Sequence, residues 1–157
     1  MPSVLQTGES LCRILETLLF YPLPGDHIKS ILRVFIADDS VLVRERLQAR
    51  LAELEGVELV GQSGNAPEAI EAMRQLRPDV AILDIRMPGG NGLRVLEAVK
   101  AGQAPSVVIM LTAFAYPQYR SRCLAAKADY FFDKATEFDQ VFIMLEQLLR
   151  ARANLAL

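Results

Sequence analysis

The stretch VAILDIRMPGGNG, residues 80–92, places a short apolar run directly before a carboxylate and a turn-rich loop. Four consecutive apolar residues are typical of a strand covered on both faces, as strands of parallel sheets are. The stretch VFIADDS, residues 34–40, repeats the arrangement, because Asp38 and Asp39 follow its apolar run as Asp84 follows the first. These stretches predict two buried strands, each with acidic side chains at its carboxyl end.

Two further apolar runs end in polar side chains, with Thr112 closing one and Lys134 following the other. A further run after Gly56 gives a fifth predicted strand. The predicted strands cover residues 34–37, 57–60, 80–83, 106–111 and 130–132. The segments after them carry apolar residues at helical spacing, which predicts helices over residues 41–54, 66–76, 93–100, 117–127 and 137–153.

This alternation describes five β–α units with short connections. Right-handed crossovers then favour a parallel sheet with helices on both faces. The predicted fold is α/β, a doubly wound five-stranded parallel sheet of the flavodoxin-like (βα)5 type with strand order 2-1-3-4-5. Its switch point lies between strands 1 and 3, which end at Asp38 and Asp84.

Parallel strands bring their carboxyl ends to one edge, so we expect Asp38, Asp39, Asp84, Thr112 and Lys134 to meet there. Each alone has an ordinary explanation, such as a helix cap, a strand end or an exposed lysine. Together, three carboxylates repel one another, and a cation would stabilise them. Oxygen ligands suit Mg²⁺, and phosphoryl transfer needs mainly positioning and charge neutralisation. The edge is therefore a predicted magnesium and phosphoryl site, with Asp84 as a candidate carboxylate nucleophile.

Composition narrows the class of protein. The 157 residues match one domain of about 100–200 residues, and a net charge of -2 argues against direct nucleic-acid binding. Cys12 and Cys123 form no CxxC pair and no metal cluster with His27, which favours a reduced, cytoplasmic protein. No run approaches the roughly 18 apolar residues of a membrane span, and the amino terminus lacks the features of a secretory signal.

Residues 1–32 differ from the rest and are predicted to form an extension, with the main domain at 33–153. Apolar residues at helical spacing between Leu11 and Leu19 predict a short amphipathic helix, and Pro22 and Pro24 end it. The helix could pack loosely on the domain, belong to a partly disordered extension, or bind a partner or a second copy of the chain. The sequence leaves these alternatives open.

Over residues 32–153 the chain resembles the receiver domain of two-component response regulators. The matching segments are VFIADDS (34–40), VAILDIRMPGGNGL (80–93), VIMLTAF (108–114) and YFFDKATEF (130–138). The resemblance implies that Asp84 is the phosphoacceptor and that Mg²⁺ is held by Asp38, Asp39, Asp84 and the backbone carbonyl of Arg86.

The resemblance also implies a phosphate-binding and switching group. Thr112 would be the switch hydroxyl, the amide of Ala113 would bind phosphate beside it, and Lys134 would pair with the phosphoryl group. Phe131 stands at the aromatic switch position and would turn inward on phosphorylation, although plain core packing also explains an aromatic residue in a strand. The chain departs from the family pattern at Ala135, where a proline is frequent, and at Lys127, where a helix-ending glycine is common.

The resemblance implies a signalling protein rather than an enzyme. Its phosphodonor would be a sensor histidine kinase or a histidine phosphotransfer protein. Output would pass through the surface of residues 117–127, 130–132 and 137–153. Because no effector segment follows, we expect a single-domain regulator that binds a downstream protein, passes the phosphoryl group onward or forms a homodimer.

Two other functions fit parts of the pattern. A phosphate-independent interaction module would keep the fold alone, without needing the five site residues. A phosphatase or phosphotransferase acting through an aspartyl phosphate would need a second acidic residue two positions after Asp84, where Arg86 stands.

Overall fold

The computed structural model describes residues 31–102 and 106–155. The amphipathic helix expected within residues 1–32 lies outside the described residues. The division at residues 32 and 33 stays a prediction.

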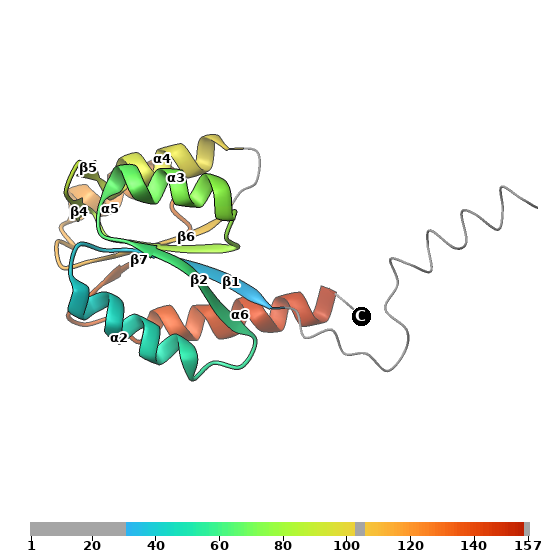
Figure 1. The fold of residues 1–157 in the computed structure, drawn as a ribbon. Coiled ribbons are helices and arrows are strands. Elements are labelled where there is room, and N and C mark those ends of the chain that lie inside the picture. Colours follow the sequence, from blue (N-terminus) through green and yellow to red (C-terminus); the bar gives the residue numbers. More distant parts are fainter. Residues whose placement is uncertain (1–30, 103–105, 156–157) are drawn as a thin grey trace, which may run out of the picture.

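The described chain is built around one five-stranded parallel sheet (Figure 1). Its strands run in the order β2-β1-β3-β6-β7, which confirms the flavodoxin-like topology. Their bounds are β1 Leu32–Ala37, β2 Val57–Ser63, β3 Val80–Leu83, β6 Val107–Thr112 and β7 Tyr130–Asp133. Residues 32–37 of β1 pair with β2, with one irregularity between Val34 and Phe35, and residues 34–37 also pair with β3.

Helices cover both faces of the sheet, as the alternation predicted. α3, α4 and α5 lie on one face, and α2 and α6 lie on the other (Figure 1). Their bounds are α2 Val41–Ala52, α3 Ala66–Leu76, α4 Gly92–Ala101, α5 Pro117–Ala125 and α6 Gln140–Leu155. Among the described residues, no helix combines the length and the apolar character that a membrane crossing requires.

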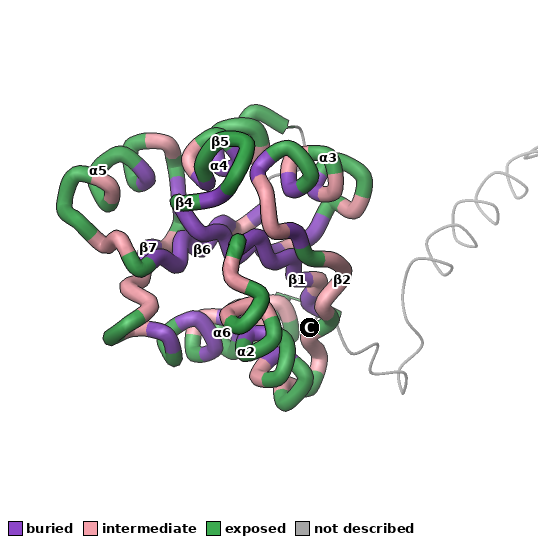
Figure 2. The backbone as a smooth tube through the Cα atoms, turned by 60° about the vertical axis from the view of Figure 1, so that its left-hand side comes forward, coloured by how far each residue is buried: buried purple, intermediate pink, exposed green. Residues whose placement is uncertain are grey.

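Alternation along the strands divides the core into two layers. Phe35 and Ala37 pack under α3, α4 and α5, whereas Val34 and Ile36 pack against α2 and α6. Side chains of a strand point to opposite faces in turn, so an apolar run without interruption fills both layers. Figure 2 shows the result, with the central strands buried between helices whose outer sides are exposed, while the edge strand β2 is only partly buried.

The structure differs from the predicted boundaries at several places, by one to three residues at most element ends. β2 continues to Ser63, whose carbonyl accepts a hydrogen bond from the Asp38 amide at 3.0 Å. The loop after Asp84 contains a two-stranded hairpin of β4, Arg86–Met87, and β5, Gly90–Asn91. α6 begins at Gln140, three residues later than predicted, and residues 138–139 before it form a turn. Lys127, where the family pattern commonly has a helix-ending glycine, has a left-handed backbone with φ 71°.

An ion pair at the opposite edge of the sheet ties α6 to the strand starts. Asp79 accepts hydrogen bonds from the amide of Arg33 at 2.8 Å and from Arg152 Nη2 at 2.5 Å. Burial alone would raise the pKa of Asp79, but the bonds from Arg152 and Arg33 outweigh it and hold the pKa below its ordinary value.

This depressed pKa predicts a pH-dependent contribution to stability. A carboxyl whose folded-state pKa is lowered stabilises the protein above its unfolded-state pKa of about 4, and the contribution is lost as the pH falls through the folded-state value. We expect Asp79→Asn to cost the same free energy of unfolding from about pH 7 to pH 5, and progressively less below about pH 4. Urea unfolding followed by circular dichroism measures this. A difference between wild type and variant that stays constant down to about pH 3 would contradict it.

Candidate functional site

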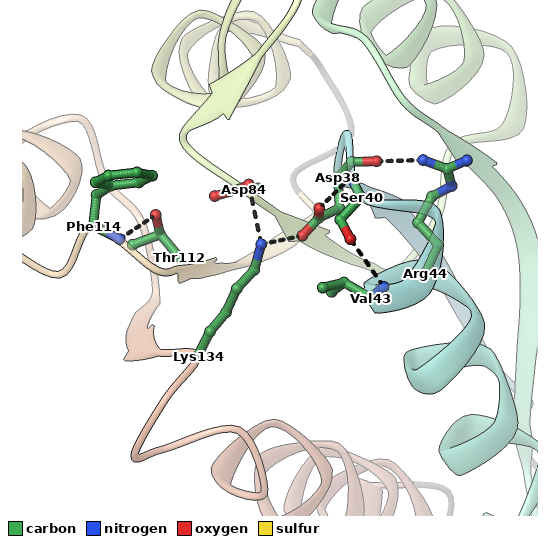
Figure 3. A network of polar contacts seen from close by, with 8 residues as sticks. All are labelled: Asp38, Ser40, Val43, Arg44, Asp84, Thr112, Phe114 and Lys134. Atoms are coloured by element: carbon green, nitrogen blue, oxygen red, sulfur yellow. Dashed lines mark hydrogen bonds and ion pairs between the residues drawn. The ribbon is translucent and has the colours of Figure 1, made fainter.

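The carboxyl ends of four strands bring the predicted side chains to one edge. Asp38 follows β1, Asp84 follows β3, Thr112 ends β6 and Lys134 follows β7. Strand pairing continues for one step into these loops, because the Asp84 amide donates to the carbonyl of Ala37 at 2.8 Å and the Lys134 amide to that of Thr112 at 2.9 Å. Backbone pairing therefore sets the positions of the four side chains (Figure 3).

Lys134 lies between two buried carboxylates. Its Nζ is 2.5 Å from Asp38 Oδ2 and 3.1 Å from Asp84 Oδ2 (Figure 3). Burial alone would lower the pKa of Lys134, but the hydrogen bond to Asp38 and the charges of Asp84 and Asp38 outweigh it and raise the pKa. The ammonium is therefore charged, and it offsets one of the two buried negative charges.

Asp38 is held through all four of its polar atoms. Its amide donates to Ser63, and its carbonyl accepts from Arg44 Nη1 at 2.6 Å. Its Oδ1 accepts from the amide of Ser40 at 2.9 Å, and its Oδ2 pairs with Lys134. Burial nonetheless raises the pKa of Asp38, and the neighbouring Asp84 adds to the increase against these bonds. Three carboxylates, of Asp38, Asp39 and Asp84, thus share a pocket with the ammonium of Lys134.

The acidic pocket suits a divalent cation. Asp38, Asp39 and Asp84 each offer a carboxylate oxygen, and the three lie within 4.8 Å of one another. Among the described residues, Asp84 Oδ1 is buried and has no hydrogen-bond partner. A buried polar atom without a partner is costly unless something binds it. Two buried carboxylates beside the exposed Asp39 form the oxygen set that Mg²⁺ prefers.

A cleft of about 490 Å³ opens beside this pocket. Asp39, Arg86, Phe114 and Tyr119 are among its lining residues. The guanidinium carbon of Arg86 lies 4.5 Å from the centre of the Phe114 ring, a cation–π contact across the cleft. The side chain of Arg86 is thus engaged on Phe114, and the assignment of its carbonyl to a cation stays a prediction.

Thr112 is buried, but its hydroxyl is not paired with Asp84. The Thr112 Oγ1 accepts a hydrogen bond from the amide of Phe114 at 3.1 Å, and Figure 3 shows it on the side away from Lys134. Ala113 lies between them and is exposed. The roles predicted for the Thr112 hydroxyl and the Ala113 amide stay predictions.

Phe131, the residue at the predicted aromatic switch position, is buried in this structure. It is already 4% exposed and packs in the core layer under α3, α4 and α5. Alternation along β7 assigns it to this face, and Arg120 covers the ring, with Cζ 4.8 Å from its centre. The ring is therefore already inward in this structure, and a movement of Phe131 on phosphorylation stays a prediction.

Sequence reasoning missed one glycine that fixes the position of Asp84. A Cβ on Gly92 would overlap the backbone carbonyl oxygen of Asp84. The Gly92 amide also donates to the carbonyl of Ile85 at 2.7 Å, so α4 begins in contact with the loop that follows β3 and carries Asp84. The signal was present as three glycines within residues 89–92, but a turn explains such a cluster equally well.

A parallel sheet with an acidic pocket at its switch point defines a class of phosphoacceptor proteins, and comparison with known proteins agrees. Residues 34–146 match the family model described as the response regulator receiver domain. The chain belongs to this family, and as a receiver domain it is a phosphoacceptor signalling module rather than a catalytic enzyme.

Individual relatives support the same assignment. The chain is 37% identical over 119 residues to an uncharacterized response regulatory protein of Yersinia pestis, which covers 76% of this chain and 49% of that protein. The chain thus spans about half the length of that relative. The response regulator domain of Thermotoga maritima CheB has a TM-score of 0.68 at 29% identity, covering 79% of this chain and 97% of that one.

A third comparison concerns a relative solved with bound groups. It is the CheX–CheY–BeF3–Mg²⁺ complex from Borrelia burgdorferi, with a TM-score of 0.64 and 26% identity. The match covers 73% of this chain and 89% of that one.

Proposed function

We propose that the chain accepts a phosphoryl group on Asp84 from a phosphohistidine, with Mg²⁺ bound in the acidic pocket. The observation that carries this is Asp84 itself, a buried carboxylate with one oxygen paired to Lys134 and the other without a partner among the described residues. A carboxylate oxygen would form the new P–O bond while the P–N bond to the donor imidazole breaks. The donor is a sensor histidine kinase or a histidine phosphotransfer protein, met in the cytoplasm.

The neighbouring residues have distinct parts in this proposal. Asp38, Asp39, Asp84 and the Arg86 carbonyl would hold Mg²⁺, which supplies charge neutralisation for the transferred group. The Borrelia complex, which contains a chain similar to this one, was solved with Mg²⁺ and beryllofluoride, a combination that supports the assignment. Lys134, charged and between the carboxylates, would pair with phosphoryl oxygens in place of one of them.

Output would begin at Thr112. Its hydroxyl, the Ala113 amide and Lys134 would bind the phosphoryl oxygens, because phosphorylation adds strong acceptors and about two negative charges. Turning toward the phosphoryl group breaks the bond between Thr112 Oγ1 and the Phe114 amide, which frees the loop before α5. We infer that a downstream protein, or a second copy of the chain, reads the resulting change on the surface of α5, β7 and α6.

Metal removal tests the proposal. With acetyl phosphate and Mg²⁺, we expect the intact mass to rise by one phosphoryl group, and with excess EDTA we expect no increase, because the pocket cannot accept a dianion beside uncompensated carboxylates. A wild-type protein that gains no mass with Mg²⁺, while a known receiver domain in parallel does, would favour the phosphate-independent interaction module.

A further inference from the structure

The loop that carries Lys134 is closed by its own hydrogen bonds. The amide of Glu137 donates to the carbonyl of Asp133 at 2.8 Å, and the amide of Asp133 donates back to Glu137 Oε2 at 2.9 Å. The amide of Ala135 donates to Asp133 Oδ1 at 2.7 Å, a bond that a proline at this position could not make. Asp133 and Glu137 therefore hold the turn that the family pattern often builds with proline.

Arg120 joins this loop to α5 and to Phe131. Its Nη2 lies 3.6 Å from Glu137 Oε2, and its Nη1 donates to the carbonyl of Phe131 at 3.3 Å. The same guanidinium lies over the Phe131 ring. One side chain of α5 thus contacts the strand before Lys134 and the residue that closes the loop after it.

The contacts differ in strength. The ion pair of Arg120 and Glu137 is long and partly exposed, with 44% and 38% side-chain exposure, so by itself it contributes little. The bond from the Asp133 amide to Glu137 is short and charge-assisted, and a guanidinium over an aromatic ring adds a planar contact. These contacts act together, because Glu137 both accepts from the Asp133 amide within the loop and forms the ion pair with Arg120 of α5.

We propose that Glu137 and Arg120 are positioning residues for Lys134. Glu137 fixes the turn that aims the ammonium at Asp84, and Arg120 links that turn to α5 and β7. We call the contacts among Asp133, Glu137 and Arg120 the clasp. Through the clasp, the packing of α5 on β7 would influence the reactivity of Asp84. The inference rests on the proposed phosphoryl transfer, because it concerns the lysine that would bind the phosphoryl group.

The first test needs no phosphoryl group. We compare Glu137→Ala, Glu137→Gln, Arg120→Met and the double variant Glu137→Ala/Arg120→Met by amide hydrogen exchange and amide spectra. In Glu137→Ala we expect exchange at Asp133 to rise about tenfold and the Lys134 amide signal to shift. Glu137→Gln keeps an acceptor oxygen and should restore most of the protection.

Arg120→Met, a change on α5, should shift the same amide signals of the loop. Glu146→Ala and Arg122→Met, exposed positions on α6 and α5, are matched controls and should leave them unchanged.

The second test measures phosphoryl uptake from acetyl phosphate with Mg²⁺. We expect Glu137→Ala and Arg120→Met each to slow uptake about three- to tenfold, and the double variant to be no slower than Glu137→Ala, because residues of one clasp are not additive. Unchanged exchange at Asp133 in Glu137→Ala overturns the clasp. Altered exchange with wild-type uptake overturns the positioning role. A wild type without uptake overturns the proposed function and with it this role, while exchange still reports whether the clasp exists.

Discussion

Replacing Asp84 with asparagine should abolish phosphoryl uptake and, without Mg²⁺, raise the free energy of unfolding. The first effect follows from the proposed chemistry, because an amide oxygen is a poor nucleophile and cannot form the acyl phosphate. The loss should be complete in an intact-mass assay with acetyl phosphate and Mg²⁺. Mass gained at the wild-type level by Asp84→Asn would show that the phosphoryl group goes elsewhere.

The second effect follows from the charges in the pocket. Asp38 and Asp84 are both buried and share one ammonium, and Asp84 Oδ1 has no partner within the described residues. Asparagine removes the like charge beside Asp38 and keeps an oxygen that can accept from Lys134. Since an unpaired buried charged atom costs roughly 1–3 kcal/mol, we expect a gain of about 1 kcal/mol, or a few degrees in Tm.

Thermal unfolding with EDTA and with Mg²⁺ separates these contributions. Wild type should gain stability with Mg²⁺, by mass action of a ligand that binds the folded state, and Asp84→Asn should gain much less. Glu97→Gln, an exposed change on α4, controls for the loss of a carboxylate and should respond to Mg²⁺ as wild type does. If Asp84→Asn were less stable than wild type in EDTA, the attraction between Lys134 and the Asp84 carboxylate would exceed the cost of burying that carboxylate beside Asp38.

The sequence identified the residues whose positions the backbone alone determines. Asp38, Asp84, Thr112 and Lys134 each stand at the end of an apolar run, and a parallel sheet must bring such ends together. Their grouping follows from strand order, which local patterns and short connections already specify.

The sequence did not predict contacts made by long side chains that reach between elements. Arg44 of α2 donates to the carbonyl of Asp38, and Arg120 of α5 covers Phe131. On the other face, Arg46 and Arg50 lie over the rings of Phe138 and Phe142, at 3.9 and 4.5 Å. An arginine on an amphipathic helix looks like any exposed charge, and which ring or carbonyl it meets depends on how two helices pack.

The importance of Gly92 was also missed because it depends on a contact between two elements. Its replacement is the second change for which we expect a large effect. We expect Gly92→Ala to cost about 2–4 kcal/mol of unfolding free energy and to lower phosphoryl uptake, because the new Cβ would overlap the Asp84 carbonyl oxygen. The atoms that must move are backbone on both sides, at the start of α4 and at the phosphoacceptor. Neither can yield as a flexible side chain would.

Gly64→Ala is the matched control, because it makes the same chemical change beside the same pocket. There the nearest atom to an added Cβ is Arg44 Nη1 at 3.1 Å, the movable end of a side chain, so the cost should stay below about 1 kcal/mol. Urea unfolding gives the free energies, and intact mass after a fixed time with acetyl phosphate and Mg²⁺ gives uptake. If Gly92→Ala were as stable and as reactive as Gly64→Ala, the contact between α4 and Asp84 would not position the phosphoacceptor. If the Gly92→Ala variant is destabilised but takes up the phosphoryl group normally once folded, Gly92 contributes to stability alone. Slower uptake at a temperature where the variant is folded would show that Gly92 also helps to position Asp84.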